Sequence, residues 1–280
     1  MDDEKVLCEV TENHLNTGLR GIPVGTCRTS FVTPTEGVHY CGYPIKELVD
    51  FSPEDIIYLL FNKELPTAAQ STAFKADLAA RGHVPGGLAN VLQTLPTDGH
   101  PMDWLSVGIH TLGMLETTED WREDALNLIA RMPRLMGLIF RYREGRGADI
   151  ADDDTSKSLV QRFVDTVGVD EHLKAKMERV VSTYLVLHMD HGGGNLSTFT
   201  GKSIASGKAT VYSAIAGAMN ALSGPLHGRA NQSCLEFVLK IGTSDEVEVE
   251  NFVRNELKEG RPVFGFGHAV LSVEDPRATA

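Results

Sequence analysis

Hydrophobic residues recur at spacings of three and four positions through most of this chain, which is the period of an α-helix with one buried face. The spacing is clear at Leu126, Ile129 and Met132, and again between positions 160 and 167. At Ser52-Pro53-Glu54-Asp55 a capping serine, a first-turn proline and two acids precede a run of aliphatic residues, an order typical of a helix start. We therefore predict a mainly α-helical protein.

The residues up to Gly42 are instead rich in glycine, threonine and proline, with a short β-branched run from Thr29 to Thr33. Such a segment favours a short N-terminal β hairpin. After it, Leu65-Pro66-Thr67 is expected to end the first long helix and to cap the next one.

Two later helices have compositions that bear on packing. The segment from Met177 to His188 has a long apolar face, so we expect a buried rod whose C-terminal end presents His188, Asp190 and His191. The stretch from Ala214 to Leu222 is almost entirely small or apolar. It lets another helix approach closely, and it predicts burial in the core or at an interface between identical subunits.

Composition narrows the function classes. A chain of 280 residues with 42% hydrophobic content can bury a substantial core, as one large domain or two smaller ones. A formal charge of -12 without a basic block argues against nucleic-acid binding, and no apolar run of about 18 residues indicates a membrane span. The start, Met1-Asp2-Asp3-Glu4, is acidic, and the four cysteines lack C-x-x-C spacing. We expect a cytoplasmic protein with free thiols.

Three histidines and one arginine lie in glycine-rich contexts, where backbone can approach a bound anion: His191, His227, His268 and Arg277. These residues predict a carboxylate substrate. His227 directly precedes a helix expected over Ala230 to Lys240, whose dipole favours a neutral imidazole that donates to a developing oxyanion. Arg277 has the two-pronged geometry that grips a carboxylate.

Other interpretations of the same residues remain open. A single histidine beside glycines is more often a structural hydrogen-bonding group than a catalyst. His188, Asp190 and His191 together also suit a divalent metal, as in a metal-dependent hydrolase, although no H-E-x-x-H spacing supports that reading.

Three long motifs resemble the citrate synthase family. The segment Leu187 to Thr198 resembles the motif L-H-x-D-H-E-x-x-N-x-S, and Gly224 to Asn231 resembles G-P-L-H-G-x-A-N. The segment Gly265 to Arg277 resembles G-[FY]-G-H-x-V-x-x-x-x-D-P-R, and weaker similarity covers essentially the whole chain.

The resemblance implies an almost entirely helical homodimer, with a large domain over residues 1–228 and the start of a small, mobile domain over residues 229–280. His191, His268 and Arg277 match positions that hold oxaloacetate, and His227 and His268 match the two catalytic histidines. The stretch that receives the adenine of CoA is matched by Pro262, Val263, Phe264 and Gly265.

The implied reaction condenses acetyl-CoA with oxaloacetate to give citrate and CoA. An aspartate removes a methyl proton, neutral His227 donates to the enolate oxygen, and His268 polarises the oxaloacetate carbonyl. The resemblance implies no metal and no tightly bound cofactor, with acetyl-CoA as co-substrate. Partners are then the two small-molecule substrates and a second copy of the chain.

Two departures qualify this expectation. Gly192 occupies the position of the family's glutamate after the D-H pair. The family's catalytic aspartate belongs to a part beyond Ala280, so we expect a chain impaired in condensation. The alternatives are a 2-methylcitrate synthase that uses propionyl-CoA, and a non-catalytic family member that binds a dicarboxylate or CoA.

Overall fold

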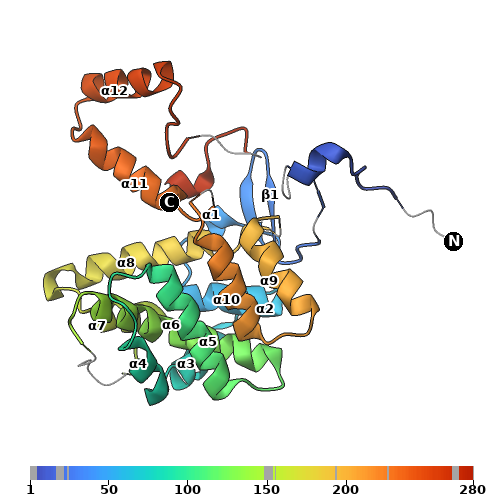
Figure 1. Cartoon of the computed structure of the whole chain (residues 1–280), viewed down its shortest axis with the longest axis vertical. Helices are drawn as coiled ribbons and strands as arrows, with labels where there is room; N and C mark the ends of the chain where they lie inside the picture. Colours follow the sequence, from blue (N-terminus) through green and yellow to red (C-terminus); the bar gives the residue numbers. More distant parts are fainter. Residues whose placement is uncertain are drawn as a thin grey trace.

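A computed structural model describes residues 5–16, 22–23, 25–147, 154, 156–192, 194–225, 227–266 and 271–279. Within them the protein is mainly α-helical, as predicted, and a small sheet lies at one side (Figure 1). The strands are β1 Ser30–Thr33, β2 Gly37–Tyr40 and β3 Tyr43–Pro44. The helices are α1 Ile45–Leu48, α2 Pro53–Asn62, α3 Ala68–Arg81, α4 Gly86–Leu92, α5 Pro101–Glu116, α6 Trp121–Arg143, α7 Leu159–Val167, α8 Glu171–His188, α9 Leu196–Ser206, α10 Val211–Leu222, α11 Ala230–Ile241 and α12 Glu246–Lys258, with 3-10 turns η1 Glu12–Asn16 and η2 Pro276–Thr279.

The predicted N-terminal hairpin is present and gains a third strand. β1 and β2 pair antiparallel with Ser30 opposite Tyr40, and β2 continues into β3. Cys41 and Gly42 join β2 to β3 with φ angles of 50° and 94°. Positive φ at both central residues is typical of the tight turns whose twist matches that of the strands, and glycine adopts it readily.

Two helix starts read from the sequence are confirmed. Ser52 caps α2 by accepting a hydrogen bond from the Asp55 backbone N–H, and Pro53 occupies the first turn. Thr67 caps α3 in a reciprocal capping box with Gln70. In both cases the side chain satisfies backbone donors that the first helical turn leaves without partners.

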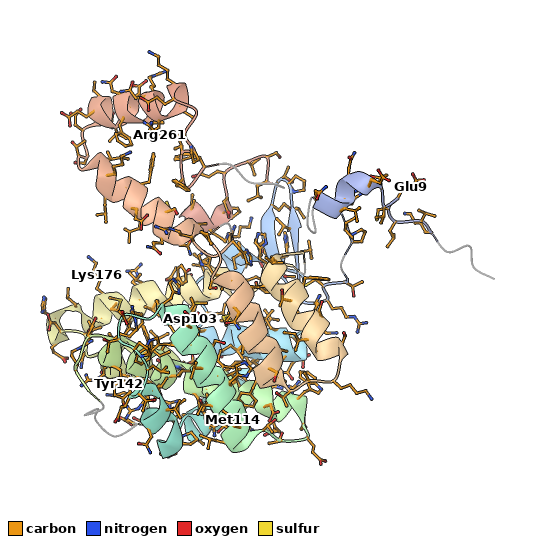
Figure 2. All side chains as sticks on the ribbon, viewed as in Figure 1. Glu9, Asp103, Met114, Tyr142, Lys176 and Arg261 are labelled. Carbon is orange, nitrogen blue, oxygen red and sulfur yellow. The ribbon has the colours of Figure 1, made fainter. Side chains whose placement is uncertain are left out.

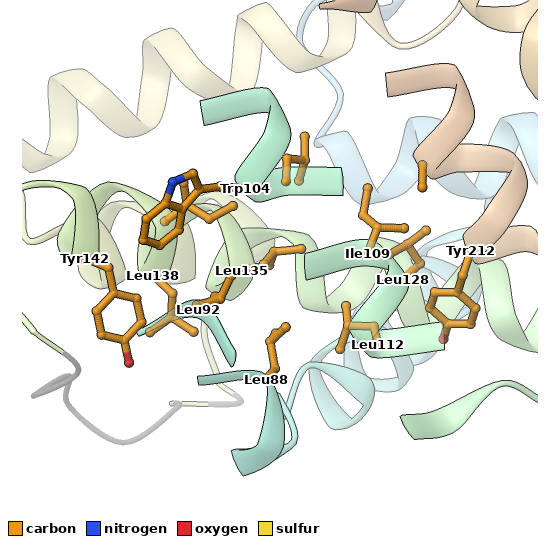
Figure 3. Close-up of a cluster of buried hydrophobic side chains, with 13 residues drawn as sticks. Leu88, Leu92, Trp104, Ile109, Leu112, Leu128, Leu135, Leu138, Tyr142 and Tyr212 are labelled. Carbon is orange, nitrogen blue, oxygen red and sulfur yellow. The ribbon is translucent and has the colours of Figure 1, made fainter. Parts of the chain in front are cut away.

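The largest hydrophobic cluster lies between α4, α5, α6 and α10 (Figure 3). Leu135 of α6 is fully buried against Gly108 of α5, where an added Cβ would lie 2.6 Å from Leu135 Cδ1. A Cβ added to Gly113 of α5 would likewise lie 2.7 Å from the Cβ of Tyr212 in α10. The absent side chains therefore let α5 contact both neighbours closely.

α9 and α10 pack against each other through small residues, as the composition of α10 predicts. A Cβ on Gly217 of α10 would lie 2.1 Å from Ile204 Cδ1, and one on Gly201 of α9 would lie 3.2 Å from the Ala214 carbonyl oxygen. The segment that contains Asp190 and His191 precedes α9, and the segment that contains His227 follows α10.

The expectation that Met177 to His188 forms a buried rod is wrong. Of α8, only Val186 and Leu187 are buried, and they join Tyr40 in the cluster beside the sheet. Val180 and Tyr184 remain 56% and 47% exposed. The apolar face is present in the sequence, but neighbouring elements fully bury only two residues in the last turn of α8.

α11 and α12 lie apart from the main group of helices (Figure 1). Figure 2 shows Arg261, just after α12, far from Tyr142 and Met114 in the helical body. The two helices contact each other through Phe237 and Phe252, whose ring centroids are 5.6 Å apart. Within the described residues, no helix combines the length and apolar character needed to cross a membrane.

Candidate functional site

His227 contacts the first turn of α9. Its Nε2 accepts a hydrogen bond from the Ser197 backbone N–H at 3.2 Å and lies 3.1 Å from Ser197 Oγ. Because the Nε2 lone pair accepts from an N–H, we assign the ring proton of the neutral imidazole to Nδ1. The expected neutral donor is thus supported by the N-terminus of α9, whereas the sequence had suggested the helix that follows His227.

Asn195 fixes the position of Ser197. The Asn195 side chain caps α9 by accepting from the Thr198 backbone N–H at 2.8 Å, and it also accepts from Ser197 Oγ at 2.8 Å. No role for Asn195 or Ser197 was predicted from the sequence. The sequence did contain a signal for Asn195. An asparagine whose side chain can accept from a helical backbone N–H two or three residues later is a common N-cap.

His191 lies between Asp190 and Gly192, two residues that hydrogen bonds attach to the sheet. Thr29 Oγ1 donates to the Asp190 carboxylate, and Ser30 Oγ accepts from the Gly192 backbone N–H at 2.5 Å. Tyr40 links the two sides, because its hydroxyl donates to the Val186 carbonyl at 3.0 Å and accepts from the Asp190 N–H at 3.3 Å. These contacts place exposed His191 at the edge of the sheet.

His188 does not share the site of Asp190. Its Nδ1 donates to the Tyr184 carbonyl at 2.8 Å, and its ring stacks on the Tyr184 ring at a centroid separation of 4.2 Å. Among the described residues, no three His, Cys, Asp or Glu side chains converge as metal ligands would. The geometry therefore gives no support to the metal-hydrolase alternative.

Arg277 lies in η2, which packs beside the hairpin and α1. Its guanidinium makes a forked contact with Asp275, with Nη2 donating to Oδ2 at 2.6 Å and Nε donating to Oδ1 at 3.0 Å. Burial raises the pKa of Tyr40, and the positive charge of Arg277 opposes that shift. The fold thus brings Arg277 to the same sheet edge as the Asp190 loop.

Close packing attaches the segment before Arg277 to the hairpin. Ser272 donates from its backbone N–H to the Pro34 carbonyl at 2.9 Å. A Cβ on Gly37 would lie 2.8 Å from Pro276 Cδ. Residues more than 230 positions apart therefore form one surface, whereas the predicted site residue His268 lies outside the described residues.

Of the stretch Pro262–Gly265, Pro262 and Phe264 line a cavity of about 310 Å³ together with residues of α11 and α12. Phe264 packs edge-on against Phe237, with centroids 6.1 Å apart. Gly265 has φ of +90°, and a Cβ there would lie 3.3 Å from Cys234 Sγ. Three cations also line the cavity: Arg229, Lys240 and Arg261.

A buried acid balances two of these cations. Glu256 is 6% exposed, and its carboxylate accepts from Arg261 at 2.6 and 2.7 Å and from Lys240 at 3.5 Å. Hydrogen bonding from Arg261 lowers the pKa of Glu256 to about 2. The carboxylate is therefore ionised at neutral pH and orders both cations at the cavity.

The sequence-family model described as the citrate synthase C-terminal domain matches residues 18–280 of this chain. The chain belongs to the citrate synthase family. It is 32% identical over 98% of its length to the mitochondrial 2-methylcitrate synthase of Yarrowia lipolytica and, likewise over 98%, 32% identical to the mitochondrial citrate synthase of Saccharomyces cerevisiae. It covers 65% and 63% of those two relatives, which is less than two thirds of their length.

A solved structure confirms the fold. The citrate synthase of Thermoplasma acidophilum, in a ternary complex with carboxymethyl coenzyme A and oxaloacetate, matches 94% of this chain with a TM-score of 0.80. The sequences are 24% identical, and the match covers 70% of that structure. The mainly helical architecture is therefore that of the citrate synthase family.

The comparison with the two yeast relatives shows that the expectation of a cytoplasmic protein is wrong, because both relatives are named as mitochondrial. The expectation rested on acidic residues at the start of the chain. Such residues do not report the compartment, since an address is read from a dedicated segment.

Proposed function

We propose that this chain contributes to the condensation of acetyl-CoA with oxaloacetate, giving citrate and CoA. The observation that carries the proposal is the orientation of His227. Its Nε2 accepts from the Ser197 N–H, so its Nδ1–H is the ring's available donor. A neutral donor aimed at a thioester carbonyl stabilises the enolate that forms when a proton leaves the adjacent carbon.

The dicarboxylate is held by His191, Arg277 and His268. Arg277 supports this role by its position beside the Asp190 loop, and its fork already engages the Asp275 carboxylate. Oxaloacetate would share that fork or displace Asp275. His268 polarises the ketone carbonyl and protonates its oxygen as the new carbon–carbon bond forms, and hydrolysis of the citryl thioester then releases CoA.

The CoA moiety is received at Pro262, Val263, Phe264 and Gly265. The cations Arg229, Lys240 and Arg261 lie nearby, each paired with Glu236 or Glu256, and the phosphates of CoA would compete with these carboxylates for the cations. CoA thus acts as a co-substrate, and no tightly bound cofactor or metal takes part.

The proposal includes two domains and a homodimer. A boundary near residue 228 is supported by the separation of α11 and α12 from the other helices (Figure 1). Exposed apolar side chains at the end of α5, Met114 at 79% and Leu115 at 50%, offer surface that a second copy would cover. Light scattering coupled to size-exclusion chromatography measures the mass directly.

The test is thiol release from acetyl-CoA in the presence and absence of oxaloacetate. We expect this chain to release thiol slowly, and His227→Ala to lower the oxaloacetate-dependent rate that remains by about 10²-fold or more. His188→Ala is the matched control, since that histidine lies on the exposed side of α8. Equal and measurable oxaloacetate-dependent rates for the two variants would contradict the assignment of His227.

A second candidate is 2-methylcitrate synthesis from propionyl-CoA. It is favoured by the equal identity of the chain to a citrate synthase and to a 2-methylcitrate synthase. One methylene in a pocket discriminates by about 1–3 kcal/mol, so a parallel assay with propionyl-CoA separates the two.

The expected impairment of the 280-residue chain stays a prediction. Calorimetric titration with oxaloacetate addresses it together with the non-catalytic alternative. Binding without thiol release supports a chain that holds the dicarboxylate without converting it, whereas absence of binding contradicts the proposed dicarboxylate site.

A further inference from the structure

The side chain of Tyr40 lies where the sheet meets the end of α8. Tyr40 is fully buried, and the aliphatic side chains of Val38, Leu48 and Val186 belong to the same hydrophobic cluster. Close packing leaves a buried ring little freedom to move. The position of the Tyr40 hydroxyl is therefore fixed by the ring that carries it.

The Tyr40 hydroxyl takes the place of one hydrogen bond of a helix. In an uninterrupted α-helix, the Val186 carbonyl would accept from the N–H four residues later, which is that of Asp190. Here the hydroxyl donates to the Val186 carbonyl at 3.0 Å and accepts from the Asp190 N–H at 3.3 Å. A phenol has one proton to donate and lone pairs that accept, so it satisfies both backbone groups.

This insertion coincides with the end of α8. Met189, the residue after the helix, still has helical dihedral angles, with φ of -70° and ψ of -32°. The chain leaves the helical path at Asp190, two residues before Gly192, which has φ of +77°. A side chain inserted between a helical carbonyl and its N–H partner is a known cause of helix distortion. The Tyr40 hydroxyl thus accounts for the departure at Asp190.

The same strand pair also holds the residues on either side of His191. Ser30 lies directly opposite Tyr40 in the antiparallel pair, so both side chains emerge on one face of the sheet. Ser30 Oγ accepts from the Gly192 N–H at 2.5 Å, and Thr29 Oγ1 donates to the Asp190 carboxylate. The backbone before and after His191 is therefore tied to β1 and β2.

We propose that Tyr40 is a positioning residue of the candidate site, whose hydroxyl ends α8 and directs the chain so that His191 meets the dicarboxylate. The inference rests on the proposed function, because that function assigns the dicarboxylate to His191. Since Tyr40 is fully buried, it acts through the backbone of Asp190 and not by contact with a substrate.

The substitution Tyr40→Phe removes the hydroxyl and leaves the packed ring unchanged, so the variant should fold. The carbonyl of buried Val186 then loses the donor that the hydroxyl supplied, and a buried carbonyl without a donor is costly. The Asp190 N–H is the helical donor for that carbonyl. We expect α8 to extend to Asp190, which draws Asp190 away from Thr29 and displaces His191.

The experiment compares the full chain with Tyr40→Phe in two measurements. The backbone ¹³Cα chemical shifts of residues 189–191 report whether the helix extends, and calorimetric titration with oxaloacetate reports the dicarboxylate site. We expect the shifts in Tyr40→Phe to move toward helical values. We also expect the affinity for oxaloacetate to fall about tenfold, the factor that loss of one hydrogen bond to a charged group brings.

Tyr142→Phe is the matched control. Tyr142 is also buried, its hydroxyl accepts from Gln93 Nε2 at 2.9 Å, and it lies in the largest hydrophobic cluster (Figure 3). This variant loses the same atom from a buried ring, and it should keep the chemical shifts of residues 189–191 and the oxaloacetate affinity of the parent chain. An equal loss of affinity in both variants would overturn the positioning role, and so would unchanged shifts in Tyr40→Phe.

The titration of the parent chain separates this inference from the proposed function. If the parent chain binds oxaloacetate and Tyr40→Phe binds it equally well, the proposed function stands and the positioning role is overturned. If the parent chain does not bind oxaloacetate, the proposed function fails, and the chemical shifts of residues 189–191 still decide whether Tyr40 ends α8.

Discussion

Replacing Gly228 by alanine tests whether the turn after α10 positions His227 by steric packing. Gly228 follows His227 directly. The Gly228 backbone N–H donates to the Gly224 carbonyl at 3.1 Å, and the His227 backbone N–H donates to the same carbonyl at 3.0 Å. A Cβ on Gly228 would lie 2.0 Å from the Leu222 carbonyl oxygen. That obstacle is backbone, so it cannot rotate aside as a side chain would.

The size of the effect follows from this distance. A Cβ contact needs at least 3.0 Å, so the turn must open by about 1.0 Å. Overpacking of this kind costs about 1–3 kcal/mol of unfolding free energy. The same displacement would stretch the 3.1 Å contact of His227 with Ser197 Oγ beyond hydrogen-bonding range, and a 1 Å error at a catalytic group costs about 10²-fold in rate.

Urea unfolding measures the stability, and nitrogen NMR of the imidazole reports which His227 nitrogen carries the proton. Gly224→Ala is the matched control in the same turn, because its Cβ would make an ordinary 3.7 Å contact with the Ala221 carbonyl. We expect Gly228→Ala to lose stability and the defined His227 tautomer while Gly224→Ala keeps both. Equal stability and equal spectra for the two variants would refute the reasoning.

Three further predictions concern stability. Leu135→Ala in the fully buried core should cost about 2–5 kcal/mol in urea unfolding, while Leu173→Ala at a 41% exposed position of α8 should change it by less than about 0.5 kcal/mol. Asn195→Ala should cost about 1 kcal/mol through the lost cap, and Asn195→Asp should restore most of it; equal losses would contradict the capping role. For Asp55, burial acts to raise the pKa, but hydrogen bonds from two serines and a lysine outweigh it and lower the pKa below 3.8. Its stabilisation is therefore present above the unfolded-state pKa and lost as pH falls through the folded one. Asp55→Asn should flatten the fall in unfolding free energy below about pH 4, and an unchanged acid limb would contradict this.

Local signals in the sequence were sufficient for much of the secondary structure. Ser52 and Thr67 cap their helices as predicted, because a hydroxyl next to free backbone donors acts within three residues of its own position. The small residues of α10 likewise predicted a close helix contact, since absence of a side chain is a property of the residue itself. Which helix makes that contact was not contained in the pattern.

The interpretation of α8 shows where such reasoning ends. Its apolar stripe is real, yet Val180 and Tyr184 are largely exposed, because burial depends on whether another element covers the stripe. Periodicity defines a face of a helix but not the neighbour of that face. In the same way, the sequence around His227 did not predict its contact with the first turn of α9.

The candidate site shows the same difference between what local sequence predicts and what the fold decides. The sequence by itself indicated the family, since His191, His227, His268 and Arg277 stand in long motifs that resemble it, and it predicts that these four residues carry the chemistry. Only the tertiary structure decided what positions them: Ser197 at His227, and Thr29 and Ser30 at the His191 loop. A hydrogen bond between residues 30 or 160 positions apart depends on how the chain folds back on itself, and no local preference encodes that distance.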